Sequence, residues 1–173
     1  MSADLTITIA TKKDIESLEK LVNSAYRGEA SKKGWTTEAN LIEGQRIDRE
    51  SLTAQMSDPD VVILKNTNNE RQITGCVYLQ KKGEKLYLGM LTVSPVLQAN
   101  GLGKRLLEAA EDYARSINYH IIVMTVITTR TELLAWYERR GYYKTGEVIP
   151  LVITENFGIL RQPVEMFKLE KAV

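Results

Sequence analysis

Residues 86–117 place a glycine-containing turn between an apolar stretch and an amphipathic one. Residues 86–93 are apolar enough for a buried strand. Pro95 ends this stretch, because proline has no amide hydrogen to donate to a sheet. Beyond the turn, apolar residues recur with the period of a helix: Leu102, Leu106, Ala109, Ala110, Tyr113 and Ile117. The sequence therefore predicts a strand, a turn and a helix in close succession.

The turn itself, residues 98–104, has the composition of an anion site. Gly101 and Gly103 lack a Cβ, so a ligand can approach the backbone closely. The first amides of a helix have no acceptor within the helix and lie at the positive end of its dipole. Such amides bind phosphate groups whatever the side chains are. We therefore expect this turn to hold the pyrophosphate of a cofactor. A dinucleotide fingerprint is disfavoured, because the third glycine is missing and the next predicted strand ends in Thr128 and Thr129.

Length, charge and cysteine content exclude several classes of protein. The 173 residues predict one domain over residues 1–173 with a sizeable core. The net charge is only +1, so the basic surface of a nucleic-acid-binding protein is missing. A single cysteine, Cys76, excludes an intramolecular disulfide and the cysteine-based metal motifs, and no metal is expected. The sequence lacks a signal-peptide pattern and an apolar stretch of about 20 residues, which predicts a soluble, cytoplasmic protein.

Hydrophobic periodicity along the whole chain predicts an α/β (α+β) fold. Strands are predicted at residues 5–9, 61–64, 73–80, 85–93, 121–127, 142–151 and 164–169. Helices are predicted at residues 15–25, 48–57 and 102–117, followed by a last helix that Thr129 or Thr131 caps and Gly141 ends. The order β-α-α-β-β-β-α-β-α-β-β indicates a mixed sheet with helices on both faces.

Two sequence blocks resemble those of the GNAT superfamily of acyl-CoA-dependent N-acyltransferases. The first, LTVSPVLQANGLGKRLL, is similar to the family's CoA-binding motif, and the second, LLAWYERRGYYKTGE, is similar to its helix-strand motif. The resemblance covers nearly the whole chain and implies a mostly antiparallel sheet. The segments that contain Trp35, Glu38 and Arg130 also resemble a bacterial subgroup of unspecified substrate.

The resemblance implies a site for acetyl-CoA. It implies that backbone amides of the turn bind the pyrophosphate: Gln98, Ala99, Asn100, Gly101, Leu102, Gly103 and Lys104. It places the pantetheine arm along Leu91, Thr92 and Val93, with the Val93 amide polarising the thioester carbonyl. Such a donor stabilises the oxyanion that develops when an amine attacks. The implied reaction is direct acetyl transfer to a neutral primary amine, without a metal or a covalent enzyme intermediate.

Such a transfer needs an acid for the leaving thiolate and a base for the amine. The resemblance places the acid at Tyr137, since a phenol and a thiol have pKa values of roughly 10 and 8.5. The base is Tyr87, acting through water, or Glu38. Arg130 stands seven residues before Tyr137, where many relatives carry asparagine, so the two share a helix face. A CoA phosphate and a substrate carboxylate both remain open as its ligand.

Each of these side chains is also compatible with a purely structural role. Tyr137 can belong to the core, and Tyr87 can be a packed strand residue. Trp35 can anchor its loop, while Glu38 and Arg130 can be solvated charges near helix starts. The sequence alone does not decide between these roles and the catalytic ones.

Two classes of function follow from this pattern. The first is an N-acetyltransferase that acts on a small-molecule amine or an exposed protein amine. The second is a non-catalytic acyl-CoA-binding sensor, which Tyr137 and residues 91–93 disfavour. Residues 26–46, with Trp35 and Glu38, are expected to form the acceptor site, but their mixed charges indicate no acceptor class. Neither a nucleic acid nor a membrane is expected as a partner. The oligomeric state stays open, and a homodimer is compatible with the sequence.

Overall fold

The computed structural model describes residues 6–26, 42–43, 47–95, 101–151, 159–160 and 163–173. The elements are β1 (Thr6–Ile9), the 3-10 turn η1 (Lys12–Asp14), α1 (Ile15–Tyr26), β2 (Ile42–Glu43), α3 (Arg49–Ser57), β3 (Val61–Thr67), β4 (Ile73–Lys82), β5 (Lys85–Val93), α4 (Leu102–Ser116), β6 (Ile121–Ile127), α5 (Thr131–Glu138), β7 (Tyr143–Pro150), β8 (Ile159–Leu160) and β9 (Glu165–Ala172). Apart from η1 and the two-residue strands β2 and β8, this is the predicted order.

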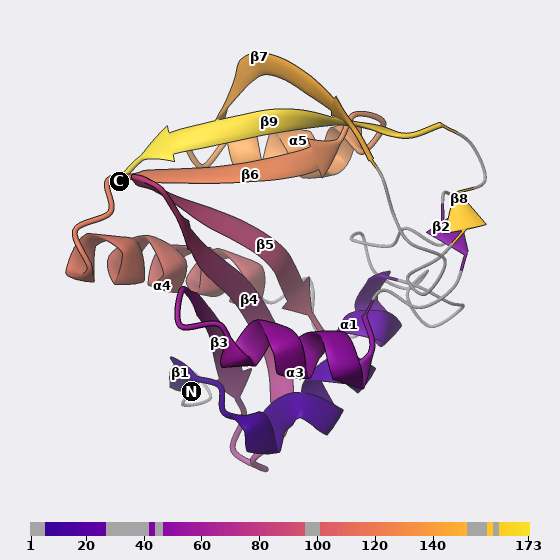
Figure 1. The fold of residues 1–173 in the computed structure, drawn as a ribbon, viewed down its shortest axis with the longest axis vertical. Helices are drawn as coiled ribbons and strands as arrows, with labels where there is room; N and C mark the ends of the chain where they lie inside the picture. Colours follow the sequence, from indigo (N-terminus) through magenta and orange to yellow (C-terminus); the bar gives the residue numbers. More distant parts are fainter. Residues whose placement is uncertain (1–5, 27–41, 44–46, 96–100, 152–158, 161–162) are drawn as a thin grey trace.

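The main sheet has seven strands in the order β1-β3-β4-β5-β6-β9-β7 (Figure 1). Among the described strands, β5 and β6 pair in parallel, and every other pair in this sheet is antiparallel. β6 lies inside the sheet and its residues are mostly buried, as its continuous apolar sequence predicts. The fold class expected from the sequence is therefore confirmed.

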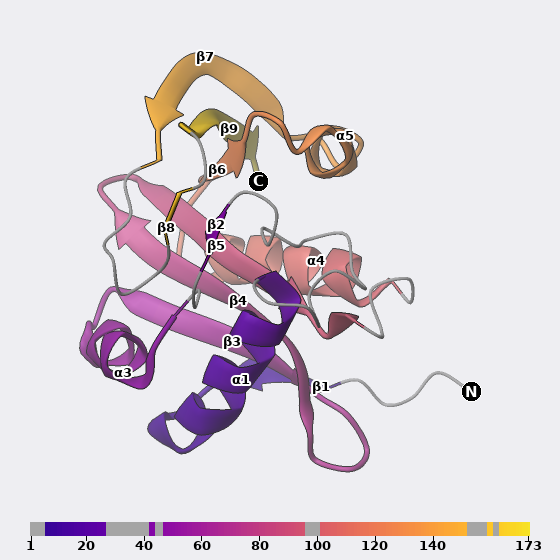
Figure 2. The same ribbon diagram turned by 90° about the vertical axis from the view of Figure 1, so that its right-hand side faces the viewer.

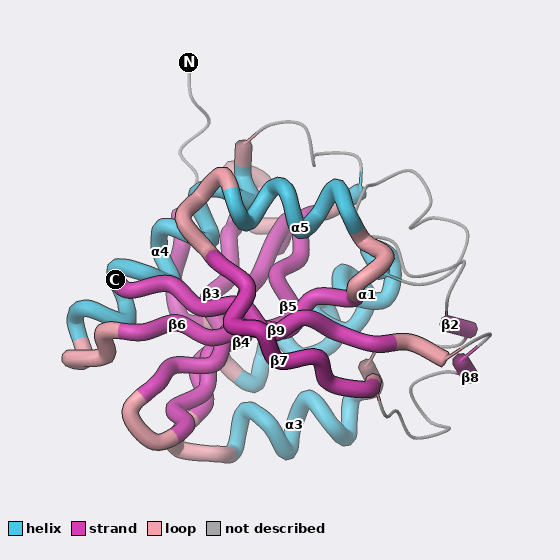
Figure 3. The backbone as a smooth tube through the Cα atoms, turned by 90° about the horizontal axis from the view of Figure 1, so that it is seen from above, coloured by secondary structure: helices cyan, strands magenta, loops and turns pink. Residues whose placement is uncertain are grey.

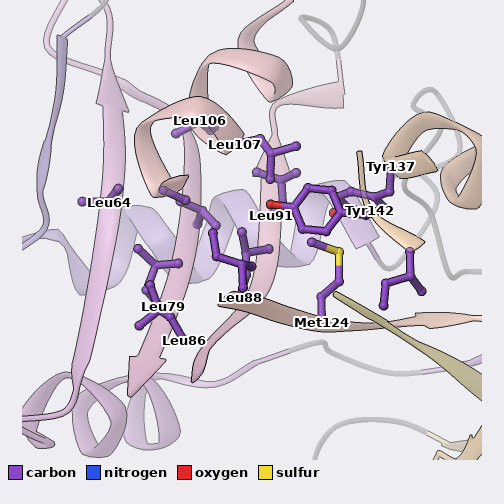
Figure 4. Packing of buried hydrophobic residues seen from close by; sticks show 14 of the residues in the cluster. Leu64, Leu79, Leu86, Leu88, Leu91, Leu106, Leu107, Met124, Tyr137 and Tyr142 are labelled. Carbon is purple, nitrogen blue, oxygen red and sulfur yellow. The ribbon is translucent and has the colours of Figure 1, made fainter. Parts of the chain in front are cut away.

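Helices cover both faces of the sheet, which confirms the second part of that expectation. Figure 2 shows α1 and α3 on one face of β3, β4 and β5, with α4 on the other, and Figure 3 shows α5 on the side of α4. Two apolar clusters result. The cluster under α4 and α5 includes Leu64, Leu79, Leu86, Leu88, Leu106, Leu107, Met124 and Tyr137 (Figure 4). The cluster under α1 and α3 includes Leu18, Val22, Leu52, Ile63, Cys76 and Met90.

α4 packs closely on the sheet because of a glycine in β4. Its buried face contains Leu106 and Ala110, and its outer face carries Lys104 and Glu108. A Cβ at Gly75 would lie 2.8 Å from Leu106 Cδ1, closer than real Cβ atoms approach. Glycine at this position therefore lets the helix and β4 come into contact.

Local signals fix the start of α3 and the end of α5, whereas the predicted cap of α5 is wrong. Asp48 caps α3 by accepting a hydrogen bond of 2.7 Å from the Ser51 amide. Gly141, at φ 95°, closes α5 as predicted, because its amide donates to the Glu138 carbonyl. The prediction that Thr129 or Thr131 caps α5 is wrong: Arg130 occupies the N-cap and makes no side-chain capping bond. None of the described helices is long and apolar enough to cross a membrane.

Candidate functional site

The parallel strands β5 and β6 are in register over only two residue pairs. These pairs are Leu86 with Ile122 and Tyr87 with Val123. Both strands continue beyond this point, and Figure 1 shows them diverging from a common start. Among the described strands, the C-terminal part of β5 therefore pairs only with β4, and the side of β5 that diverges from β6 is called the opening below.

The backbone of Val93 is directed toward this opening. The Ser94 amide donates a hydrogen bond of 2.8 Å to the Thr74 carbonyl, so these two residues form a hydrogen-bonded pair of the antiparallel ladder. Val93 lies opposite Gly75, the next pair. Because successive residues of a strand alternate in direction, the Val93 amide points away from β4. This is the geometry that an oxyanion donor at Val93 requires.

The first turn of α4 follows shortly after the end of β5. Gly101 occupies the N-cap with φ 77°, in the left-handed region that favours glycine. The Arg105 amide is the first to bond within the helix, to the Gly101 carbonyl at 3.2 Å. The amides of residues 102–104 therefore have no acceptor within α4. Leu102 is buried, so only its backbone can serve a ligand, whereas Lys104 is exposed and lies 3.9 Å from Glu108.

Tyr137 lies on the buried face of α5. Its ring makes edge contacts with Trp136 and Tyr142, at centroid distances of 5.0 and 5.8 Å. Burial raises the pKa of the Tyr137 phenol above its usual 10.0. The phenols of Tyr26 and Tyr87 raise this pKa further, and Arg130 lowers it. These effects indicate that Tyr137, Tyr87 and Arg130 lie close to one another.

Tyr87 is half-buried and lies over its own strand. A Cβ at Gly89 would lie 2.9 Å from Tyr87 Cε1 and 3.1 Å from its hydroxyl, so the ring extends along β5 over Gly89. Its ring meets Tyr78 edge-on at 6.2 Å, and Lys82 Nζ lies 4.5 Å from its centroid. These contacts suit a packed strand residue as well as a proton relay.

The structure describes only part of the predicted site. Trp35, Glu38, Gln98, Ala99 and Asn100 lie outside the described residues. The remaining predicted residues lie on three elements: Tyr87 near the start of β5 and residues 91–93 at its end, residues 101–104 at the start of α4, and Arg130 and Tyr137 at the N-cap and on the buried face of α5. In the part of the chain that the structure describes, no three histidine, cysteine or carboxylate side chains group as a metal site requires.

One contact at this site has no signal in the sequence. Tyr26, the last residue of α1, donates a hydrogen bond from its hydroxyl to the Leu91 carbonyl. The two residues are 65 positions apart, and a tyrosine at a helix end is unremarkable on its own. Only the pairing of β5 with its neighbours shows that this carbonyl lies at the opening.

The family comparison agrees with this geometry. Residues 26–151 match the family model described as the acetyltransferase (GNAT) domain. These residues include β5, α4 and α5. No curated relative matches the sequence.

Solved structures with the same fold share little sequence with this chain. The ribosomal-protein-S18-alanine N-acetyltransferase from Escherichia coli has a TM-score of 0.73 at 14% identity, covering 98% of this chain and 94% of its own. A chimera of the spermidine N-acetyltransferase from Vibrio cholerae has a TM-score of 0.71 at 16% identity, covering 98% of this chain and 96% of its own. An N-acetyltransferase from Thermoplasma acidophilum, solved with coenzyme A, has a TM-score of 0.69 at 18% identity, covering 98% of this chain and 99% of its own. At these identities the likeness concerns the fold.

Proposed function

The chain belongs to the GNAT acetyltransferase family, and we propose that it is an N-acetyltransferase that moves an acetyl group from acetyl-CoA directly to a primary amine. The observation that carries this proposal is the direction of the Val93 amide, which points away from β4 at the C-terminal end of β5. A thioester placed along this edge of β5 would have its carbonyl oxygen within reach of that amide.

The residues present fit acetyl-CoA as the donor. Backbone amides at the start of α4 suit a pyrophosphate, and Gly101 holds the conformation that begins this helix. Lys104, in the first turn of α4, supplies positive charge there. A solved structure with the same fold carries coenzyme A, which supports the same ligand class here. Gln98, Ala99 and Asn100 remain predicted members of the pyrophosphate site.

In the proposed transfer one bond forms, one bond breaks and two protons move. The nitrogen of the neutral amine forms a bond to the acetyl carbon, and the Val93 amide stabilises the oxyanion that develops. The carbon–sulfur bond then breaks, and Tyr137 gives its proton to the CoA thiolate. Tyr87 through water, or Glu38, takes the proton from the amine. The products are an N-acetylated amine and free CoA.

The acceptor is a small molecule or an exposed protein amine. Two proteins of the same fold act on different amines, a ribosomal protein alanine and spermidine, and so do not favour either class. We propose that Trp35 and Glu38 line the acceptor site. Arg130 is proposed to bind a CoA phosphate or an acceptor carboxylate, since its charge lies close to Tyr137.

The test is CoA release from acetyl-CoA with a panel of amines, amino acids, polyamines and peptides. An acetyltransferase releases CoA with at least one acceptor class. A protein that binds acetyl-CoA but releases no CoA with any acceptor is instead the non-catalytic sensor, the alternative function. Failure of the wild-type protein to bind acetyl-CoA would contradict both.

A further inference from the structure

β5 carries one residue more than the facing part of β4. Cys76 pairs with Thr92, but Tyr78 pairs with Gly89, so Met90 and Leu91 both face the single residue between them on β4. Met90 has φ 52°, an uncommon conformation for a side chain of this kind. Such a β-bulge bends its strand and changes the direction of its peptide groups. Contacts from the surrounding protein must therefore hold the bulge in place.

Side chains from three positions contact the carbonyls of this bulge. The Thr92 hydroxyl donates to the Met90 carbonyl at 2.8 Å, and Cys76 Sγ lies 4.0 Å from the same oxygen. The Tyr26 hydroxyl donates to the Leu91 carbonyl. Thr92 and Cys76 belong to the two strands themselves, whereas Tyr26 comes from the end of α1. The Tyr26 hydroxyl therefore links α1 to the bulge of β5.

The Leu91 carbonyl lies on the same edge of β5 as the Val93 amide. In an antiparallel ladder, hydrogen-bonded pairs recur at every second residue. Ser94 with Thr74 is such a pair, so Thr92 with Cys76, two positions along, is the next one. The Thr92 amide therefore points toward β4. In a planar trans peptide the preceding carbonyl points the opposite way. The Leu91 carbonyl is therefore directed into the opening between β5 and β6, where the Tyr26 hydroxyl meets it.

We propose that Tyr26 is a positioning residue of the acyl-transfer site, which holds the Leu91 carbonyl and thereby fixes the direction of the Val93 amide. The role rests on the proposed function, because it acts on the amide that would polarise the thioester. Only two torsions per residue separate one peptide group from the next, so turning the peptide after Leu91 reorients the Val93 amide. The effect of the Tyr26 phenol on the pKa of Tyr137 agrees with its place beside the acid.

The test replaces the hydroxyl alone, in a Tyr26→Phe variant, and measures the thioester carbonyl directly. Acetyl-CoA labelled with ¹³C at the carbonyl is bound to the protein, and its stretching frequency is read by difference infrared spectroscopy. In the wild-type protein a well-aimed amide lowers this frequency. In Tyr26→Phe we expect most of that shift to be lost, with the Kd for acetyl-CoA within a few fold. On any amine identified by the acceptor panel, kcat should fall about tenfold to a hundredfold, below the loss from removing an oxyanion donor outright.

Tyr119→Phe is the matched control. The Tyr119 hydroxyl also donates to a backbone carbonyl, that of Gly83 at 3.1 Å, but in the turn between β4 and β5. This variant should keep the frequency shift and the wild-type kcat. Replacing Tyr26 by 3-fluorotyrosine retains the hydroxyl and should retain the shift, even if Tyr26→Phe fails to fold.

Each outcome bears on one of the two proposals. A folded Tyr26→Phe protein with the wild-type shift and kcat overturns the role of Tyr26 and leaves the acetyltransferase proposal intact. Loss of the shift in the 3-fluorotyrosine protein overturns this role as well, since the hydroxyl is still there. If the wild-type protein does not bind acetyl-CoA, both proposals fail.

Discussion

Gly103 lies against the indole of Trp136, so that a Cβ at residue 103 would stand 3.5 Å from Trp136 Cζ2. This contact joins the first turn of α4 to α5. Gly101 differs: its φ is 77°, and no atom among the described residues lies within 4 Å of its Cβ position. The two glycines of the turn therefore serve different purposes. Gly101 provides a backbone conformation, and Gly103 lies where α4 contacts α5 and the end of β5.

We predict that Gly103→Ala folds and keeps its affinity for acetyl-CoA. The added Cβ makes ordinary van der Waals contacts, 3.5 Å from Trp136 Cζ2 and 3.7 Å from Val93 Cγ2, so neither side chain has to move. Alanine also favours a helix over glycine by up to about 1 kcal/mol. Urea unfolding should give a free energy of unfolding equal to that of the wild type or higher. A clear loss of stability would show that the two helices are closer than this contact indicates.

Gly101→Glu should abolish binding of acetyl-CoA. The new side chain strains a left-handed position by about 1–2 kcal/mol and places a carboxylate where the pyrophosphate is proposed to bind. Thermal-shift titration is the measurement. A ligand at 100 times its Kd stabilises a protein by about 2.7 kcal/mol, and this increase should disappear.

The matched control for this variant is Gly83→Glu. Gly83 also has a positive φ, of 60°, with no described atom within 4 Å, and lies in the hairpin turn between β4 and β5. Gly83→Glu therefore introduces the same backbone strain and the same charge in the β4–β5 turn, away from α4. Equal responses of the two variants to acetyl-CoA would contradict the pyrophosphate site at Gly101.

Glu111→Ala should destabilise the fold by about 2–3 kcal/mol. The buried Glu111 carboxylate accepts hydrogen bonds from Lys171 Nζ at 2.8 Å and from the Tyr142 hydroxyl at 3.1 Å, joining α4 to β9 and to the residue before β7. Its loss leaves both donors without this acceptor. Asp112→Ala is the control, because Asp112 pairs with Arg115 at 2.7 Å in solvent and should contribute less than about 1 kcal/mol. Equal losses in urea unfolding would refute the network.

The element order could be predicted because it depends on local patterns. The apolar stripe of α4 and the continuous apolar sequence of β6 each determine their own element, and the predicted order agrees with the structure. The start of α5 could not be predicted correctly, because threonine is a common N-cap but Arg130 takes that place.

The site was predictable only where a motif marks it. Leu91, Val93 and Gly101 lie in a recognisable block, with Leu91 and Val93 at the end of β5 and Gly101 at the N-cap of α4. The bulge at Met90 depends on how β5 pairs with β4, and the contact of Tyr26 with Leu91 joins residues 65 positions apart. Neither leaves a local pattern, since each arises from the assembled sheet.

Stability should fall as the pH rises above about 10. Burial raises the pKa of Tyr137 and of Tyr142 above 10.0, and Glu111 raises that of Tyr142 further. In the unfolded chain these phenols ionise near pH 10 while the folded protein keeps both protons. Their contribution is therefore fully present below pH 10 and is lost above it, by about 1.4 kcal/mol per pH unit for each tyrosine. Urea unfolding between pH 8 and 11 should show this slope reduced in Tyr137→Phe and Tyr142→Phe. An unchanged slope in both variants would contradict the buried phenols.

The last prediction concerns Tyr137 as the general acid. The leaving thiolate needs a proton, and the raised pKa of the Tyr137 phenol keeps its proton in place until the thiolate forms. Tyr137→Phe retains the ring, so the contacts with Trp136 and Tyr142 should survive. General-acid help is worth roughly 10²–10⁴-fold, and burial makes this phenol a weaker acid that water can partly replace. We therefore expect kcat to fall about tenfold to a thousandfold, with the Kd for acetyl-CoA within a few fold.

The measurement for Tyr137→Phe is single-turnover kinetics on an acceptor from the panel, so that the chemical step is observed rather than product release. An acceptor whose amine reacts faster should not restore the rate, because the missing proton is needed on sulfur. A thioester with a more acidic thiol should restore much of it, since its thiolate leaves without a proton. If the variant transfers acetyl groups at the wild-type rate in the chemical step, Tyr137 is a core residue and the acid lies elsewhere.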